Sequence, residues 1–126
     1  MHDNAAKPLV FVVDDEHTIA STAAMILSSG GFDARPFTDP QAALEAARIQ
    51  APNLLLSDIL MPGLNGFELS TGIVDDCPQC KILLFSGNPG ARESFAKTDA
   101  EKSWKILMKP IMPANLISEI RTMLEV

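Results

Sequence analysis

The chain of 126 residues contains no tyrosine, one tryptophan, two cysteines and two histidines. Aromatic residues make up 6% of it against 47% hydrophobic residues, so its core is expected to consist mainly of aliphatic side chains. Basic residues are also few, because ten Lys and Arg against sixteen Asp and Glu give a formal net charge of −6. Without a basic cluster to neutralise phosphates, the domain is not expected to bind nucleic acid.

Long hydrophobic runs are lacking as well. No apolar run approaches the roughly 18 residues that a membrane-spanning helix needs, and the polar N-terminus Met1-His2-Asp3-Asn4 lacks the pattern of a signal peptide. The composition is that of a globular protein, and the length suits one domain. We therefore expect a cytoplasmic protein without membrane attachment. Its single domain would span residues 1–126, with about 8–125 ordered behind a polar tail of residues 1–7.

The two cysteines stand close together as Cys77-Pro78-Gln79-Cys80, the spacing of a redox pair or of half a zinc site. A redox pair normally opens a helix, whose dipole lowers the thiol pKa, but this pair lies between Asp75-Asp76 and an apolar strand. A zinc site would need about two more ligands, and His2 and His17 are both remote in sequence. We expect two reduced thiols in a loop.

Strand and helix patterns alternate along the chain. Short apolar runs predict five strands, and periodic segments that begin at capping residues or prolines predict five helices. The expected strands are residues 9–13, 32–37, 53–57, 81–85 and 104–108. The expected helices are residues 16–29, 40–49, 65–74, 91–102 and 113–124, of which 91–102 is mostly polar.

This alternation predicts an α/β domain, in which helices cover both faces of a parallel sheet. Residues 9–13 are continuously apolar, as in a strand buried on both faces, whereas residues 32–37 contain Pro36 and belong at a sheet edge. Both placements fit a five-stranded, flavodoxin-like sheet of strand order 2-1-3-4-5. In such a sheet, ligands bind at the carboxyl ends of the first and third strands.

Polar residues follow the carboxyl ends of four expected strands: Asp14 and Asp15, Asp58, Ser86, and Lys109. A single Asp after a strand is usually a turn or cap residue, but here all four positions converge on one edge. Three carboxylates close together repel one another, and their oxygens suit a partly hydrated Mg²⁺. Together with a lysine, which can meet a phosphoryl oxygen, they predict phosphoryl transfer. Asp58 ends the central strand and is the expected nucleophile, which would form an aspartyl-phosphate.

The same residues resemble a known family over essentially the whole chain. The chain is similar to the receiver domain of bacterial two-component response regulators, of the single-domain, chemotaxis-regulator-like kind. The matching segments are Val12-Val13-Asp14-Asp15-Glu16, Leu56-Ser57-Asp58-Ile59-Leu60-Met61-Pro62-Gly63, Asn65-Gly66, Leu84-Phe85-Ser86-Gly87 and Met108-Lys109-Pro110.

The resemblance implies a function in phosphoryl signalling. Asp58 would take a phosphoryl group from a sensor histidine kinase or a histidine phosphotransferase, and a conformational change would relay the signal to a downstream effector protein. Mg²⁺ would be held by Asp14, Asp15, Asp58 and the backbone carbonyl of Leu60. Ser86 and Lys109 would contact the phosphoryl oxygens.

The resemblance also carries expectations about the protein as a whole. It would not be an enzyme beyond self-directed phosphotransfer and autodephosphorylation, and it would be a monomer or weak dimer. The Lys109-Pro110 peptide would be cis. The chain ends just after the last expected helix, as in a stand-alone receiver or one cut from a larger protein.

Two departures from the family pattern affect the expected signalling. Ile106 stands where members usually carry an aromatic residue that turns inward on activation. Just before the fifth strand, Glu101-Lys102-Ser103-Trp104 replaces the small residues that are usual in the family. We expect Ile106 to stay in place, while Ser86, Gly87 and the loop to Gly90 shift the polar helix 91–102.

Leu60 and Asn88 are the residues expected to tune dephosphorylation, because they stand two positions after Asp58 and Ser86. Side chains there orient or exclude the hydrolytic water in this family. Leu60 has no hydrogen-bonding group, so phosphate loss should be slow, although His17 is a further candidate for ordering water near this edge.

Two other functions fit part of the sequence. A haloacid-dehalogenase-like phosphatase would use Asp14 as nucleophile and Glu16 as acid/base, but no acidic motif follows Lys109 and the chain leaves little room for a cap. A degenerate receiver would signal through protein contacts alone, but such proteins usually lack one of the acidic residues or the lysine. The residue that carries the acyl-phosphate distinguishes the three alternatives.

Overall fold

A computed structural model describes residues 6–126, so residues 1–5 of the expected N-terminal tail lie outside the described part. The described chain forms one five-stranded parallel sheet with the strand order β2-β1-β3-β4-β5, as predicted. The strands are β1 (Leu9–Val13), β2 (Asp33–Phe37), β3 (Leu54–Asp58), β4 (Lys81–Ser86) and β5 (Lys105–Met108). The helices are α1 (His17–Ser29), α2 (Pro40–Ile49), α3 (Gly66–Asp76), α4 (Ala91–Phe95), α5 (Asp99–Ser103) and α6 (Pro113–Leu124).

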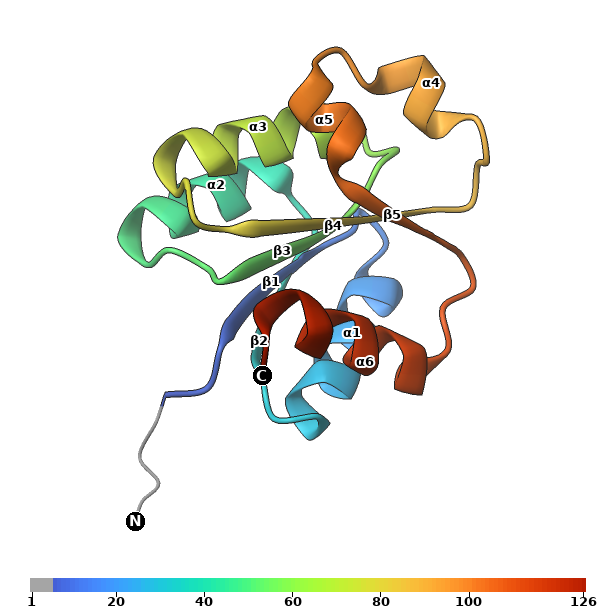
Figure 1. Ribbon diagram of the computed structural model, residues 1–126. Coiled ribbons are helices and arrows are strands. Elements are labelled where there is room, and N and C mark those ends of the chain that lie inside the picture. The colour runs from blue at the N-terminus through green and yellow to red at the C-terminus, as the bar shows by residue number, and fades with distance from the viewer. Residues whose placement is uncertain (1–5) are drawn as a thin grey trace.

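Helices cover both faces of the sheet (Figure 1). One apolar core lies between the sheet and α2 and α3, with Phe11, Leu55 and Phe67 among its fully buried members. The other lies between the sheet and α1 and α6, with Val12, Leu27 and Ile120. Alternate residues of β1 and β3 point into the two cores, which is why β1 and the first three residues of β3 are apolar.

Local sequence signals position the elements as expected. All five residues of β1 are buried, whereas the edge strand β2 is partly exposed and accommodates Pro36. The Asp39 side chain accepts a hydrogen bond from the Gln41 amide and begins α2, with Pro40 in its first turn. Asn65 and Glu68 form a capping box at the start of α3.

The prediction of a single helix over residues 91–102 is wrong. The segment contains two five-residue helices, α4 and α5, separated by Ala96, which has extended backbone, and by Lys97 and Thr98. Thr98 begins α5, because its side chain accepts from the Glu101 amide while Glu101 accepts from the Thr98 amide. This Thr-x-x-Glu capping box starts a new helix inside a polar stretch that looks continuous in sequence.

Smaller corrections concern the strand ends. β3 runs one residue further than predicted and ends at Asp58 itself, and β4 ends at Ser86. β5 begins at Lys105, because Trp104 caps the end of α5. Asp58 and Ser86 therefore belong to strands, whose ladder holds their backbones in register.

Cys77 and Cys80 are free, buried thiols in the connection from α3 to β4, as expected. The Cys80 amide donates to the Cys77 carbonyl over 3.0 Å and closes the turn. Burial raises the pKa of the Cys77 thiol, and it raises that of Cys80 to about 12. Thiols of this kind are protonated at neutral pH and are poor nucleophiles.

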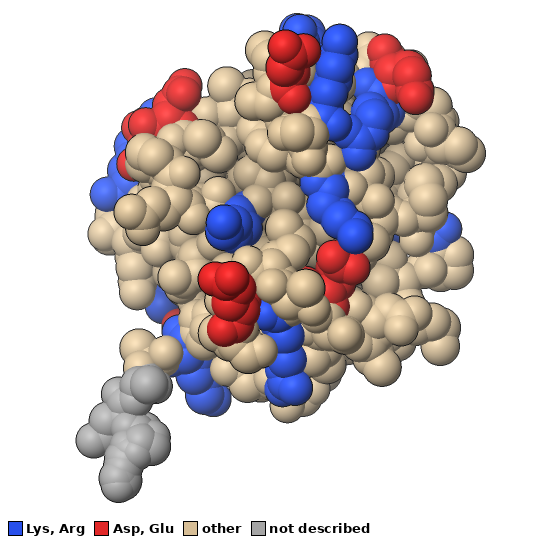
Figure 2. All heavy atoms as spheres, viewed as in Figure 1, with Lys and Arg blue, Asp and Glu red and all other residues tan. Residues whose placement is uncertain are grey.

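On the face drawn in Figure 2, acidic and basic side chains are interspersed. That face therefore presents no extended patch of one charge. Within residues 6–126, no helix has the length and hydrophobicity to cross a membrane.

Candidate functional site

The three predicted carboxylates meet at the carboxyl edge of the sheet. One oxygen from each of Asp14, Asp15 and Asp58 lies within 4.8 Å of the other two. They meet because β1 and β3 are neighbours in register, with Val13 opposite Ser57. Asp14 is fully buried, Asp58 is 8% exposed and Asp15 is exposed.

Lys109 supplies the opposite charge. Its Nζ lies 3.3 Å from an oxygen of Asp14 and 3.3 Å from an oxygen of Asp58. Its backbone amide donates to the Ser86 carbonyl over 2.9 Å, so the end of β4 positions the backbone of Lys109. The ammonium also lies 4.7 Å from the centre of the Phe85 ring. The Lys109-Pro110 peptide is cis, which confirms the prediction.

Burial and charge shift the pKa values of the central pair. Burial, together with the nearby Asp14, raises the pKa of the Asp58 carboxyl above its ordinary value, although Lys109 opposes the shift. Burial alone would lower the pKa of Lys109, but the attraction of Asp58 and Asp14 outweighs it and raises that pKa. One ammonium among three carboxylates leaves negative charge unbalanced, and hard oxygen donors of this kind fit a divalent cation such as Mg²⁺.

The Ser86 side chain bonds within its own loop. Its hydroxyl donates to the Asn88 carbonyl over 3.2 Å and accepts from the Asn88 amide over 2.9 Å. Ser86 is buried at the end of β4, whereas the following Gly87 is exposed. Contact between this hydroxyl and a phosphoryl oxygen would require the bonds to Asn88 to be exchanged, so its predicted role stays a prediction.

The remaining predicted residues lie around this edge or near it. Leu60 is 44% exposed, and Asn88 is exposed, with its side-chain oxygen accepting from the Gly90 amide. Ile106 in β5 is half-buried and packs at the margin of the α2–α3 core. His17 is exposed on the first turn of α1, where its ring lies 3.3 Å from the Ser21 hydroxyl.

Sequence reasoning missed two contacts to the site. The Glu16 amide donates to an Asp14 oxygen over 2.9 Å, so Glu16 holds Asp14 through its backbone. The Ser57 hydroxyl donates to the backbone carbonyl of Asp58 over 2.8 Å. Neither contact has a distinctive sequence signal, because Glu16 looks like a first-turn residue and Ser57 like an ordinary strand residue.

The family model of the response regulator receiver domain matches this chain over residues 10–121. The protein belongs to this family. The match spans every element from β1 through most of α6, so it covers both the fold and the acidic pocket.

Individual relatives agree with this assignment. The phosphoglycerate transport system transcriptional regulatory protein PgtA of Salmonella typhimurium is 31% identical over 111 residues, which are 86% of this chain and 26% of that protein. The DNA-binding response regulator MtrA of Mycolicibacterium paratuberculosis is 28% identical over 123 residues, which are 91% of this chain and 50% of that protein. The chain thus spans between about a quarter and half of these relatives.

A solved structure supports the fold. The CheY-like receiver domain protein from Methanospirillum hungatei superimposes with a TM-score of 0.85 at 24% identity, covering 95% of each chain. The CheY-like fold, with strand order 2-1-3-4-5, is therefore confirmed.

The chain is thus a receiver domain of two-component signalling, a class of generally non-catalytic signalling domains. Its pocket of Asp14, Asp15 and Asp58 is consistent with a phosphoacceptor aspartate and a Mg²⁺ site. The dehalogenase-like alternative has no such support, because the matching family is that of receivers.

Proposed function

We propose that this receiver domain accepts a phosphoryl group on Asp58 in a Mg²⁺-dependent reaction. The observation that carries the proposal is the position of Asp58, which lies in the carboxylate cluster, contacts Lys109 and retains some exposure. Asp14 is fully buried, and its two oxygens accept from the Glu16 amide and from Lys109. An incoming phosphorus atom therefore reaches Asp58 more readily than Asp14.

In the reaction, a carboxylate oxygen of Asp58 forms a bond to phosphorus while the bond from phosphorus to the donor breaks. With a phosphohistidine donor the leaving group is the imidazole, which takes up a proton from solvent. Asp14, Asp15, Asp58 and the Leu60 carbonyl would hold the Mg²⁺, which when bound neutralises charge on the phosphoryl oxygens. Lys109 stays anchored on Asp14 and is available to a phosphoryl oxygen.

The donor is proposed to be a sensor histidine kinase or a histidine phosphotransferase, and the receiver of the signal a downstream effector protein. Membership of the receiver family supports both partners. The net charge of −6 argues against nucleic-acid binding by this domain.

We propose a monomer or weak dimer. The switch would run through Ser86 and Gly87, whose loop bonds must rearrange if the hydroxyl turns to the phosphoryl group.

Mass spectrometry after incubation with acetyl phosphate and Mg²⁺ tests the proposal. We expect one phosphoryl group per wild-type chain, mapped to Asp58, and no labelling without Mg²⁺ or in Asp58→Asn. Asp15→Asn should require more Mg²⁺, because it removes one ligand.

Full labelling of Asp58→Asn would contradict the proposal. Labelling of Asp14 would indicate phosphatase-like chemistry. An unlabelled wild-type chain would indicate a receiver that acts through protein contacts alone.

A further inference from the structure

We propose that Ser57 is a positioning residue for phosphorylation, because its hydroxyl holds the backbone carbonyl of Asp58 and so fixes the direction of the Asp58 side chain. This inference rests on the proposed role of Asp58. Ser57 is fully buried in β3, and its Oγ donates to the Asp58 carbonyl over 2.8 Å.

The backbone from Asp58 to Leu60 is held by hydrogen bonds on both sides. The peptide between Asp58 and Ile59 has its carbonyl bonded by Ser57, and its N–H donates to the Phe85 carbonyl of β4 over 3.2 Å. The next carbonyl, that of Ile59, accepts from the Gly66 amide over 2.8 Å. These peptides join the proposed nucleophile to Leu60, whose carbonyl is a proposed metal ligand.

The first turn of α3 closes on the same carbonyl. A Cβ atom built at Gly66 would lie 2.4 Å from the Asp58 carbonyl oxygen and 2.9 Å from the Ile59 Cα, which are closer than atoms approach without displacement. Glycine therefore allows α3 to contact the Asp58 backbone directly. The Asp58 carbonyl is thus held between the Ser57 hydroxyl and the Gly66 Cα.

Ser57 faces this contact because of the strand period. Leu55 and Ile59, two residues on either side, belong to the core under α2 and α3, so Ser57 points to the same face. A hydroxyl in such a place needs a partner. An apolar residue would fill the space equally well, and what the hydroxyl adds is a donor to the Asp58 carbonyl.

Ser70 offers a matched control. It is also fully buried, and its Oγ donates to a backbone carbonyl, that of Gly66, over 2.7 Å. Ser57→Ala and Ser70→Ala thus remove the same group from equally buried sites. Only the Ser57 substitution frees the carbonyl of the proposed phosphoacceptor.

The experiment compares wild type, Ser57→Ala, Ser57→Thr and Ser70→Ala. The readouts are the initial rate of labelling by acetyl phosphate at saturating Mg²⁺, the Mg²⁺ dissociation constant by calorimetry, and the urea midpoint. Losing one positioning hydrogen bond is worth about a fivefold factor. We therefore expect Ser57→Ala to label about fivefold more slowly and to bind Mg²⁺ more weakly. Ser70→Ala should match wild type in both, although the two variants lose similar stability.

Ser57→Thr keeps a hydroxyl on the same carbon and should restore the labelling rate. Wild-type labelling and Mg²⁺ affinity in Ser57→Ala would overturn the inference, as would equal losses in Ser57→Ala and Ser70→Ala. If the wild-type chain is not labelled at all, the proposed function fails. The Mg²⁺ affinities then still show whether the Ser57 hydroxyl positions the Asp58 carboxylate for metal binding, because they do not depend on phosphorylation.

Discussion

Lys109 contacts Asp14 and Asp58 at the same distance, 3.3 Å, yet the two carboxylates differ in what phosphorylation would do to them. Asp58 would lose its carboxylate charge when its oxygen becomes part of an acyl-phosphate. Asp14 would keep its charge, and with it a fixed partner for the ammonium. We therefore expect the buried Asp14 to keep Lys109 at the site in both states.

Leu60 is the residue at which the lifetime of the phosphorylated state is expected to be set. It is 44% exposed and places apolar bulk two residues after Asp58, without a group to orient water. Leu60→Asn should therefore speed autodephosphorylation about fivefold, the value of one positioning hydrogen bond. The decay of the phosphorylated chain, followed by mass spectrometry after removal of acetyl phosphate, measures this.

Leu60→Met is the matched control, because it keeps an apolar side chain and should decay at the wild-type rate. If Leu60→Asn decays no faster than wild type, the residue does not control access of water. The exposed Asn88 would then be the next residue to substitute.

At the scale of elements, the connection from β4 to β5 divides into two parts that are held differently. In α5, the buried Glu101 carboxylate accepts from the Lys97 and Thr98 amides and from the Thr71 hydroxyl of α3. Burial alone would raise the pKa of Glu101, but these hydrogen bonds outweigh it and lower that pKa.

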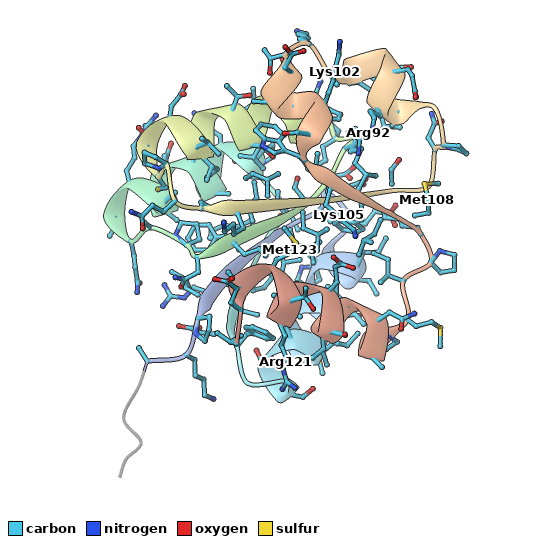
Figure 3. The ribbon with its side chains drawn as sticks, in the orientation of Figure 1. Arg92, Lys102, Lys105, Met108, Arg121 and Met123 are labelled. Atoms are coloured by element: carbon cyan, nitrogen blue, oxygen red, sulfur yellow. The ribbon has the colours of Figure 1, made fainter. Side chains whose placement is uncertain are left out.

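Aromatic stacking adds a second contact between this region and α3, since the Trp104 and Phe67 rings lie 6.3 Å apart. Arg92 of α4 donates to the backbone carbonyls of Lys102 and Trp104. Figure 3 labels Arg92 and Lys102 in this region. The loop before α4 has no comparable contact to α3: its side-chain hydrogen bonds, from Ser86 and Asn88, stay within residues 86–90.

This division predicts where activation changes the structure. Beryllofluoride with Mg²⁺, a phosphoryl mimic, should alter amide exchange most in residues 87–90. The change should be smaller in α5, which is bonded to α3, and near zero around Ile106. Weakly anchored segments are the ones that open and rearrange at low free-energy cost. Hydrogen–deuterium exchange with mass spectrometry measures this at peptide resolution.

Asp58→Asn with the same additives is the control and should show no change. Equal protection of residues 87–102 with and without the mimic would contradict the prediction. A large change at Ile106 would show that an aliphatic residue can serve as the switch.

Sequence patterns predicted the strands more accurately than they predicted the helices of the β4–β5 connection. Continuous apolar runs and Pro36 predicted which strands are buried and which lies at an edge, and these placements fit the strand order that the structure has. The division between α4 and α5 depends on the Thr98–Glu101 capping box and on the contact of Glu101 with Thr71, 30 residues away. A charged residue in a polar stretch looks exposed in sequence, and only the tertiary fold makes Glu101 a buried one.

For the whole molecule, the convergence of Asp14, Asp15, Asp58 and Lys109 followed from one rule about the edge of a parallel sheet. The positions of these residues after the predicted strands were therefore enough to predict the cluster. The present partners of Ser86 and the hold of Ser57 on Asp58 were not predictable. They depend on side-chain rotamers and loop geometry that no residue pattern encodes.

The cluster also affects the stability of the folded chain. The folded-state pKa of Asp58 is raised above its unfolded value. The contribution of this carboxyl to the free energy of unfolding is therefore greatest below the unfolded pKa and is lost as the pH rises through the folded pKa. Asp58→Asn removes this dependence. Without Mg²⁺, we expect it to increase the free energy of unfolding at pH 7, with the gain disappearing below about pH 4. Urea unfolding across this pH range measures the effect.

Asp15→Asn provides the comparison, because the exposed Asp15 side chain should give a smaller gain. Added Mg²⁺ should stabilise wild type more than Asp58→Asn, since a ligand stabilises the state that binds it. A loss of stability in Asp58→Asn at pH 7 would show that the Lys109 contact outweighs the burial of the carboxylate.

The stacking of Trp104 on Phe67 also has an optical consequence. Trp104 is the only tryptophan and there is no tyrosine, so the near-ultraviolet emission of the chain comes essentially from one indole. That indole lies where α5 passes into β5, half-buried against α3. The protein thus contains its own fluorophore, at the end of the β4–β5 connection that is opposite the loop of residues 86–90. A change in emission on activation would report a change at that junction, where Trp104 stacks on Phe67.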